Sequence, residues 1–205
     1  MARTPKVVED RHEQIIDAAL RVFAEKGFAR ATNRDIAHAA GITTGLIYYY
    51  FKSKEDLLKA ALEERSPVHL VAQISPEMLE QPPVILLPIL IARVLGMVES
   101  EQFVNIIRVL LPEMLHGRDT EVASIIVSFF QRVLGFLSNY LKLQVAKGGA
   151  RANLDADMTA QVIASSMIGM VLRRQIIRDP SVLHYTPEEL VTAILDTFLQ
   201  GILPQ

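Results

Sequence analysis

Apolar residues recur at helical spacing along almost the whole chain, and no segment keeps up an alternation of apolar and polar residues. The first periodic segment, residues 9–26, places Ile15, Leu20 and Phe23 on one face, and Gly27 follows its last turn. Because every periodic segment is helical and none is typical of a strand, the pattern predicts an all-α protein.

Two short helices are predicted next, at residues 33–40 and from residue 44 to about residue 51, with Gly41 in the turn between them. Ile47 and Phe51 form the inward stripe of the second helix, and the Thr43 hydroxyl is expected to cap its first turn. Two helices joined in this way form a helix-turn-helix motif, here residues 32–51, whose second helix can enter the major groove of DNA.

A fourth helix is predicted to begin after Ser53, which caps it, and to end before Pro67. Prolines then punctuate residues 66–83, so we expect an N-terminal three-helix DNA-binding domain at residues 1–66 and a larger C-terminal helical domain at residues 67–205. Helices of the second domain are predicted at residues 84–100 with a kink at Pro88, and at residues 101–111, 120–147, 155–178 and 187–200. Thr186 is expected to cap the last one, with Glu189 three residues further on in a capping box. The whole chain should hold about nine helices.

The run IIDAALRVFAEKGF, followed by TNRDIAHAAGI, TTGLIYYYF and KSKEDLL, resembles the DNA-binding region of the TetR family of transcriptional regulators over roughly residues 11–62. Tyr50 is a departure, because a His commonly precedes the Phe in that family. The motif and the resemblance together indicate the following DNA contacts: Asn33, Arg34, Thr43, Thr44, Gly45, Leu46, Tyr48, Tyr49, Tyr50 and Lys54.

These residue types suit contact with DNA for different reasons. Thr44 can hydrogen-bond to a base edge and Leu46 can touch a thymine methyl, unless Leu46 packs inward. The resemblance implies that Tyr49 and Lys54 contact phosphates. The net charge is −2, but residues 26–54 hold Lys26, Arg30, Arg34, Lys52 and Lys54 against Asp35 alone, a local excess of four positive charges.

The resemblance also implies that the C-terminal domain binds a ligand and forms a dimer. The ligand candidates are Phe103, Ile107, Met114, Phe129, Phe130, Met167 and Met170, although such residues also build ordinary cores. The candidates for the dimer interface are Ser165, Gly169, Leu190, Ile194 and Phe198; packing within one protomer is the competing interpretation.

Other classes of function find little support in the sequence. The chain has no cysteine and its five histidines are scattered, so we expect no catalytic residues, no metal site and no cofactor. The polar first residues lack the apolar core of a secretory signal, which favours a cytoplasmic protein. The most apolar run, residues 84–98, is too short for a membrane span and contains Pro88 and Arg93.

The sequence therefore favours a homodimeric repressor that binds double-stranded DNA at a pseudo-palindromic operator and is released by a small apolar effector. Two alternatives stay open. One is a DNA-binding protein without an effector, whose C-terminal domain only dimerises. The other is an enzyme with a vestigial DNA reader.

Overall fold

The computed structural model describes residues 5–116 and 121–203, and within these residues every regular element is a helix. This confirms the all-α prediction. The chain forms two compact units. The first unit comprises the described residues of Met1–Ser66 and Glu101–Ser128, and the second comprises those of Pro67–Ser100 and Phe129–Gln205.

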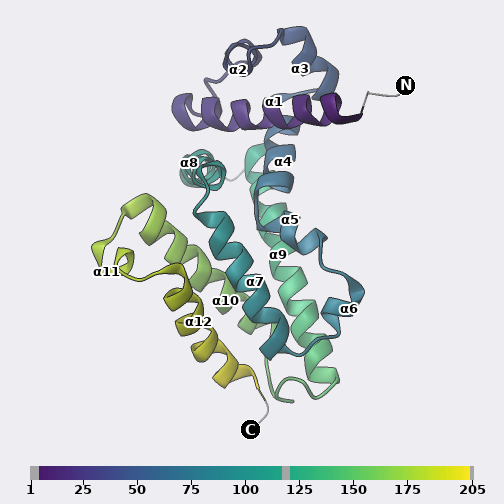
Figure 1. Cartoon of the computed structure of the whole chain (residues 1–205), viewed down its shortest axis with the longest axis vertical. Coiled ribbons are helices and arrows are strands. Elements are labelled where there is room, and N and C mark those ends of the chain that lie inside the picture. Colours follow the sequence, from purple (N-terminus) through teal and green to yellow (C-terminus); the bar gives the residue numbers. More distant parts are fainter. Residues whose placement is uncertain (1–4, 117–120, 204–205) are drawn as a thin grey trace. The chain divides into compact units, whose positions relative to one another are not determined.

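The first unit is built around the long helix α1 (Pro5–Lys26). Helices α2 (Asn33–Ala40) and α3 (Thr44–Tyr50) lie on one side of α1, and α4 (Lys54–Arg65) and α8 (Glu101–His116) lie on the other (Figure 1). Ile15, Ile16 and Phe23 of α1 are fully buried, as the amphipathic pattern predicts. The hydrophobic face of α1 therefore supports the elements of the helix-turn-helix motif.

Local chemistry sets the ends of these helices. Thr32 and Asp35 form a capping box at the start of α2, and Gly41 ends α2 with φ +64°, a left-handed conformation that suits glycine. The Ser53 hydroxyl accepts the amide of Asp56 at the start of α4, which confirms the predicted cap. The predicted bounds of α2 are also confirmed.

Helix α8 differs from the prediction in two ways. It was expected to end at residue 111, before Pro112, but it continues to His116 with Pro112 inside it. The fixed φ of proline is itself helical, so proline opposes the helix only by a lost hydrogen bond and a local clash. Residues 67–205 were predicted to form the C-terminal domain, but α8 packs against α1 and α4 within the first unit. Its residues Phe103, Ile106 and Leu110 are buried there.

The second unit contains the short helices α5 (Pro67–Ala72) and α6 (Pro76–Leu79), α7 (Pro83–Val98), most of α9 (Glu121–Ala146), α10 (Ala156–Val171), η1 (Leu172–Ile177), α11 (Pro180–Leu183) and α12 (Pro187–Ile202). Its core joins Leu86 and Leu87 of α7, Tyr140 and Leu141 of α9, and Ile163 of α10. Figure 1 shows α7 between α9 and α12 in this unit.

Two features of the second unit were not predicted. The helix expected at residues 155–178 changes to π-helical geometry over η1 and ends at Arg178, whose φ is +56°. Gln144, which is buried, donates from Nε2 to the carbonyls of Leu79 and Gln81 and so fixes the chain before α7. The predicted capping box of Thr186 and Glu189 on α12 is confirmed.

Helix α9 is long and apolar enough to cross a membrane by length and composition alone. Core helices of soluble proteins meet the same criteria, so this property does not assign a membrane segment.

Candidate nucleic-acid interface

Helix α3 is held with one side buried and the other exposed. Ile47 is 1% exposed and Phe51, directly after the helix, is 6% exposed, which confirms the predicted inward stripe. Only residues 41–43 separate α3 from α2, and the amide of Ile42 donates to the carbonyl of Ala37 at 3.0 Å. The turn is therefore short and hydrogen-bonded, and it fixes the direction in which α3 leaves α2.

The outward side of α3 carries two strongly exposed aromatic residues. Tyr48 is 59% exposed and Tyr49 is 80% exposed, far above the usual exposure of such large side chains. Gly45 is exposed, and a Cβ placed on it would meet no heavy atom within 4 Å, so another molecule can approach the backbone there. Thr44 and Leu46 are half-buried. Tyr50 is half-buried and packs edge-on against Tyr49, with ring centroids 5.2 Å apart.

Thr43 does not cap α3 through its side chain, so the predicted hydroxyl cap is wrong. The amide of Leu46 donates to the backbone carbonyl of Thr43 at 3.1 Å. The backbone thus already supplies the acceptor, and the side chain of Thr43 lies at the exposed surface.

The start of α2 presents a cation and a constrained amide. Arg34 is exposed, as a DNA contact requires. The Oδ1 atom of Asn33 is buried and has no hydrogen-bond partner among the described residues. A buried acceptor without a donor is destabilising.

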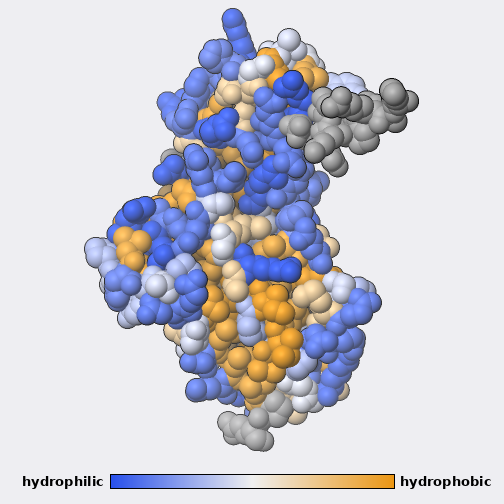
Figure 2. Space-filling view, viewed as in Figure 1, coloured by the Kyte–Doolittle hydropathy of each residue, from blue (hydrophilic) through white to orange (hydrophobic). Residues whose placement is uncertain are grey.

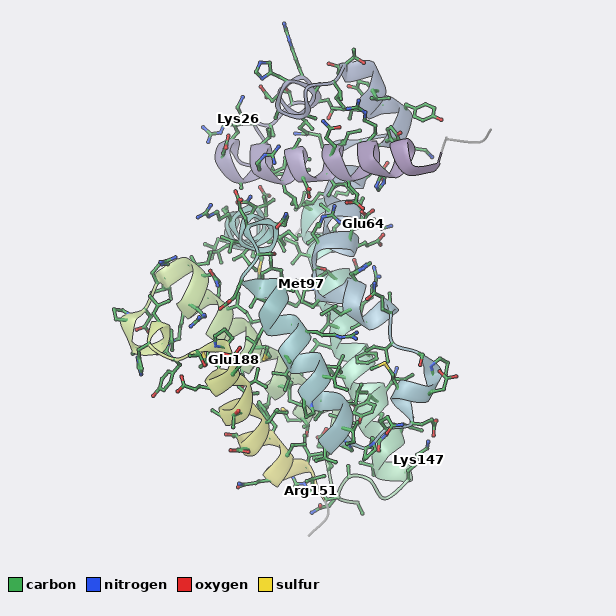
Figure 3. All side chains as sticks on the ribbon, in the orientation of Figure 1. Lys26, Glu64, Met97, Lys147, Arg151 and Glu188 are labelled. Atoms are coloured by element: carbon green, nitrogen blue, oxygen red, sulfur yellow. The ribbon has the colours of Figure 1, made fainter. Side chains whose placement is uncertain are left out.

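The local positive charge is smaller than the sequence count suggests. Lys26, at the end of α1 (Figure 3), donates to Asp35 at 2.7 Å. The hydrogen bonds from Lys26 and Thr32 lower the pKa of the Asp35 carboxyl from 3.8 to about 2, so it is charged at neutral pH. Lys26 and Asp35 therefore neutralise each other, whereas Arg34 and Lys52 are exposed cations.

Lys54 has a different environment from the one expected of a phosphate contact. Its Nζ donates to the carbonyls of Phe28 at 3.0 Å and Ala31 at 2.9 Å, with Ala29 at 3.4 Å, and it lies 4.9 Å from the centroid of the Phe28 ring. An ammonium group has three N–H donors, and three carbonyls of the α1–α2 turn occupy them. Lys54 thus joins the start of α4 to that turn.

The seven ligand candidates do not fall in one unit. Phe103, Ile107 and Met114 belong to the first unit, and the other four belong to the second. Phe103 is 7% exposed and lies on the buried side of α8, whereas Met114 is 53% exposed. In the second unit Phe129 and Phe130 are half-buried and meet edge-on with centroids 5.4 Å apart. The ligand assignment stays a prediction.

Three of the dimer candidates pack within their own protomer. Leu190 and Ile194 are 5% and 9% exposed within one protomer, and Phe198 packs against the core of the second unit. These three side chains stabilise their own protomer, because the face of α12 that looks apolar in the sequence is the face that turns inward.

The exposed apolar residues of α10 were missed by the sequence reasoning. Met158 and Val162 are 61% and 48% exposed, and with Ser165 and Gly169 they follow helical spacing along one side of α10. The spacing is visible in the sequence, but only the fold shows that this side faces outward. Figure 2 also shows an apolar area on the second unit, whose α7 exposes Val84, Ile85 and Ile89.

Comparison with known proteins identifies the N-terminal region. Residues 15–61 match the family model described as bacterial regulatory proteins, tetR family. The HTH-type transcriptional regulator HbdR of Aromatoleum sp. (strain CIB) is 48% identical over 59 residues, which make up 29% of this chain. The alignment spans only 26% of HbdR, so this likeness is confined to a part of each protein.

Two solved structures share the fold over nearly the full length. The regulator FadR from Bacillus subtilis, in complex with stearoyl-CoA, has a TM-score of 0.73 and 24% identity and covers 93% of this chain and 98% of that one. The complex of SmeT with triclosan has a TM-score of 0.78 and 22% identity and covers 96% of this chain and 93% of that one. SmeT is the repressor of a multidrug efflux pump of Stenotrophomonas maltophilia. At these identities the likeness establishes the fold.

Proposed function

The chain belongs to the TetR family of bacterial regulatory proteins through its N-terminal domain, and on that premise we propose that it is a homodimeric, ligand-responsive repressor of transcription. It acts in the cytoplasm by binding a pseudo-palindromic DNA operator, and a small apolar effector releases it. Its role is regulatory rather than enzymatic.

The exposed side of α3 is the observation that carries this proposal. A buried stripe fixes the helix, and the opposite side offers Tyr48, Tyr49, the Thr43 side chain and the open backbone at Gly45. Tyrosine hydroxyls donate hydrogen bonds to phosphate oxygens, and threonine can bond to base edges. Exposed aromatic residues next to exposed cations favour a nucleic acid over an apolar partner.

Dimerisation follows from the weakness of a single reading head. One copy has few exposed cations, and two recognition helices reach successive major grooves when they lie about 34–36 Å apart. The side of α10 with Met158, Val162, Ser165 and Gly169 supports the dimer, because small and apolar exposed residues allow close helix packing. Val162→Glu should give a monomer in light scattering, and Thr192→Glu, at an exposed position of α12, is the matched control. A dimer that persists in Val162→Glu would remove this side of α10 from the interface.

The effector is proposed to be apolar or to carry a long apolar part. In the two related structures FadR is in complex with stearoyl-CoA and SmeT is in complex with triclosan, and both compounds have large apolar groups. The second unit of this chain has half-buried Phe129, Phe130, Met167 and Met170, which are residue types that adapt to such groups. An effector that favours the released state by about 3 kcal/mol lowers operator occupancy roughly a hundredfold.

The experiment begins with selection of duplexes from a random-sequence library by the wild-type protein. We expect a sequence with two inverted half-sites, bound by a dimer, and release on adding stearoyl-CoA or triclosan. Enrichment of no sequence would overturn the DNA-binding proposal. Enrichment with no release by either compound would contradict the effector class proposed here.

A further inference from the structure

A side chain of α1 contacts the end of α2 just before the turn that leads to α3. Gln14 donates from Nε2 to the backbone carbonyl of Ala40 at 2.6 Å, across 26 positions of the sequence. Ala40 is the last residue of α2 and is 5% exposed. The last carbonyls of a helix lack partners inside that helix, so Gln14 satisfies an acceptor that the sequence near Ala40 leaves open.

Arg11 determines which end of the Gln14 amide faces Ala40. Its Nη1 donates to Oε1 of Gln14 at 2.7 Å, from one turn earlier on α1. An amide group has one accepting oxygen and one donating nitrogen, and a guanidinium can only donate. With its oxygen bonded to Arg11, Gln14 must turn its NH₂ group toward the Ala40 carbonyl. The charge on Arg11 also strengthens this chain of hydrogen bonds.

We propose that Arg11 and Gln14 are positioning residues for DNA recognition: they hold the end of α2 and thereby set the direction of α3. This inference rests on the proposed DNA-binding function. Only residues 41–43 lie between Ala40 and α3, and they have little freedom to absorb a displacement of the α2 end. A small rotation there moves Thr43 and Thr44 relative to base edges, while the contacts of Tyr48 and Tyr49 to the uniform phosphate backbone tolerate it better.

The position of each group supports a role through the turn rather than through contact with DNA. Gln14 is half-buried, and its amide oxygen and one of its two N–H donors are bonded, so turning the amide toward a base would break the contacts with Arg11 and Ala40. Other contacts between α1 and α4, such as Arg65 with Asp17 at 3.1 Å, hold the domain together but do not reach residues 40–43. Among the α1 side chains that the structure describes, Gln14 is the one with a hydrogen bond to the backbone at this turn.

The test is the ratio of affinity for the selected operator to affinity for poly(dI-dC) at fixed salt. Gln14→Glu keeps the bond with Arg11 but sets a carboxylate against the Ala40 carbonyl, and Arg11→Met leaves the amide free to flip. For Gln14→Glu we expect the ratio to fall between about threefold and about tenfold for each half-site, and for Arg11→Met by less. Gln102→Glu and Arg21→Met, at exposed positions of α8 and α1, are the matched controls.

The ratio separates positioning from a merely structural role. A general loss of stability lowers the folded fraction, so it weakens binding to both DNAs equally and leaves the ratio unchanged. Either an unchanged ratio in Gln14→Glu or an equal fall in Gln102→Glu overturns the proposal. A fall in the salt slope of Arg11→Met by about one per protomer would also overturn it for Arg11, because that result marks a direct phosphate contact.

A second measurement does not involve DNA. The amides of Gly41 and Ile42 donate to carbonyls near the end of α2, and they should exchange hydrogen faster in Gln14→Glu than in the wild type. If the exchange rates do not change, the proposal fails even when the wild type binds an operator. If exchange quickens but the wild type selects no operator, the contact holds the turn and the proposed function is what fails.

Discussion

The environment of Lys54 leads to a prediction that separates two roles for one side chain. Lys54→Met keeps the length of the aliphatic side chain and removes the ammonium group. That group donates to the carbonyls of Phe28, Ala29 and Ala31, and these carbonyls belong to the turn between α1 and α2. The loss should therefore reduce the stability of the domain before it affects any contact with DNA.

The size of the effect follows from the three contacts. A hydrogen bond to a charged group contributes about 1.5–3 kcal/mol when it is well formed and shielded from water. Lys54 is only half-buried and its bond to Ala29 is long, at 3.4 Å, so the sum is well below three full bonds. We expect the free energy of unfolding to fall by about 2 kcal/mol.

Urea unfolding followed by circular dichroism measures this change, and Lys52→Met is the control. Lys52 is an exposed lysine two positions earlier, so it loses the same charge at the same end of α4. Lys52→Met should keep the unfolding midpoint of the wild type. The dependence of operator affinity on salt should keep its slope in Lys54→Met.

The opposite pair of results would refute this reasoning. If Lys54→Met unfolds at the wild-type urea concentration and its salt slope falls by about one per protomer, then Lys54 neutralises a phosphate as the family resemblance implies. The structure-based role would then be wrong.

Three further predictions concern other parts of the molecule. Tyr49→Ala should weaken operator binding at least about tenfold while leaving the urea midpoint unchanged, because the ring is 80% exposed; unchanged affinity would mean that the reading side of α3 is misplaced. The lowered pKa of Asp35 means that its charged form stabilises the fold above about pH 3.9, the usual pKa of an unfolded Asp, and that this contribution is lost as pH falls toward about 2. The urea midpoint of Asp35→Asn should accordingly change less between pH 5 and pH 2.5 than that of the wild type, and equal changes would contradict it. Gly149→Ala should lower the free energy of unfolding by about 1–3 kcal/mol, because the new Cβ would lie 2.5 Å from Oε1 of the buried Gln144. Gly135→Ala, whose new Cβ meets no heavy atom within 4 Å, should raise the free energy of unfolding by up to about 1 kcal/mol. Differential scanning calorimetry that finds Gly149→Ala more stable than Gly135→Ala would refute this.

The predictions from sequence that were confirmed depend on residues close together in the chain. The bounds of α2, the Ser53 cap and the capping box of Thr186 with Glu189 all rest on hydrogen bonds between residues three positions apart. The inward placement of Ile47 and Phe51 follows from helical periodicity alone. These features were predictable because one short segment contains both partners.

Other features depend on contacts between distant segments, which the sequence does not decide. The sequence identifies Leu190 and Ile194 as an apolar face but cannot say whether that face meets its own core or a partner, and the fold buries both. It marks Lys54 as a cation near DNA, whereas three carbonyls from 23 to 26 positions earlier take its donors.

The sequence by itself determined the helical class, the helix-turn-helix motif and the family resemblance of the N-terminal region, because periodicity, caps and motif spacing are local properties. Only the tertiary structure decided which exposed groups are free to bind and which are already bonded. The chain of hydrogen bonds from Arg11 through Gln14 to Ala40 shows why: its two ends lie far apart in sequence, and they meet only because the apolar faces of α1 and α2 pack together.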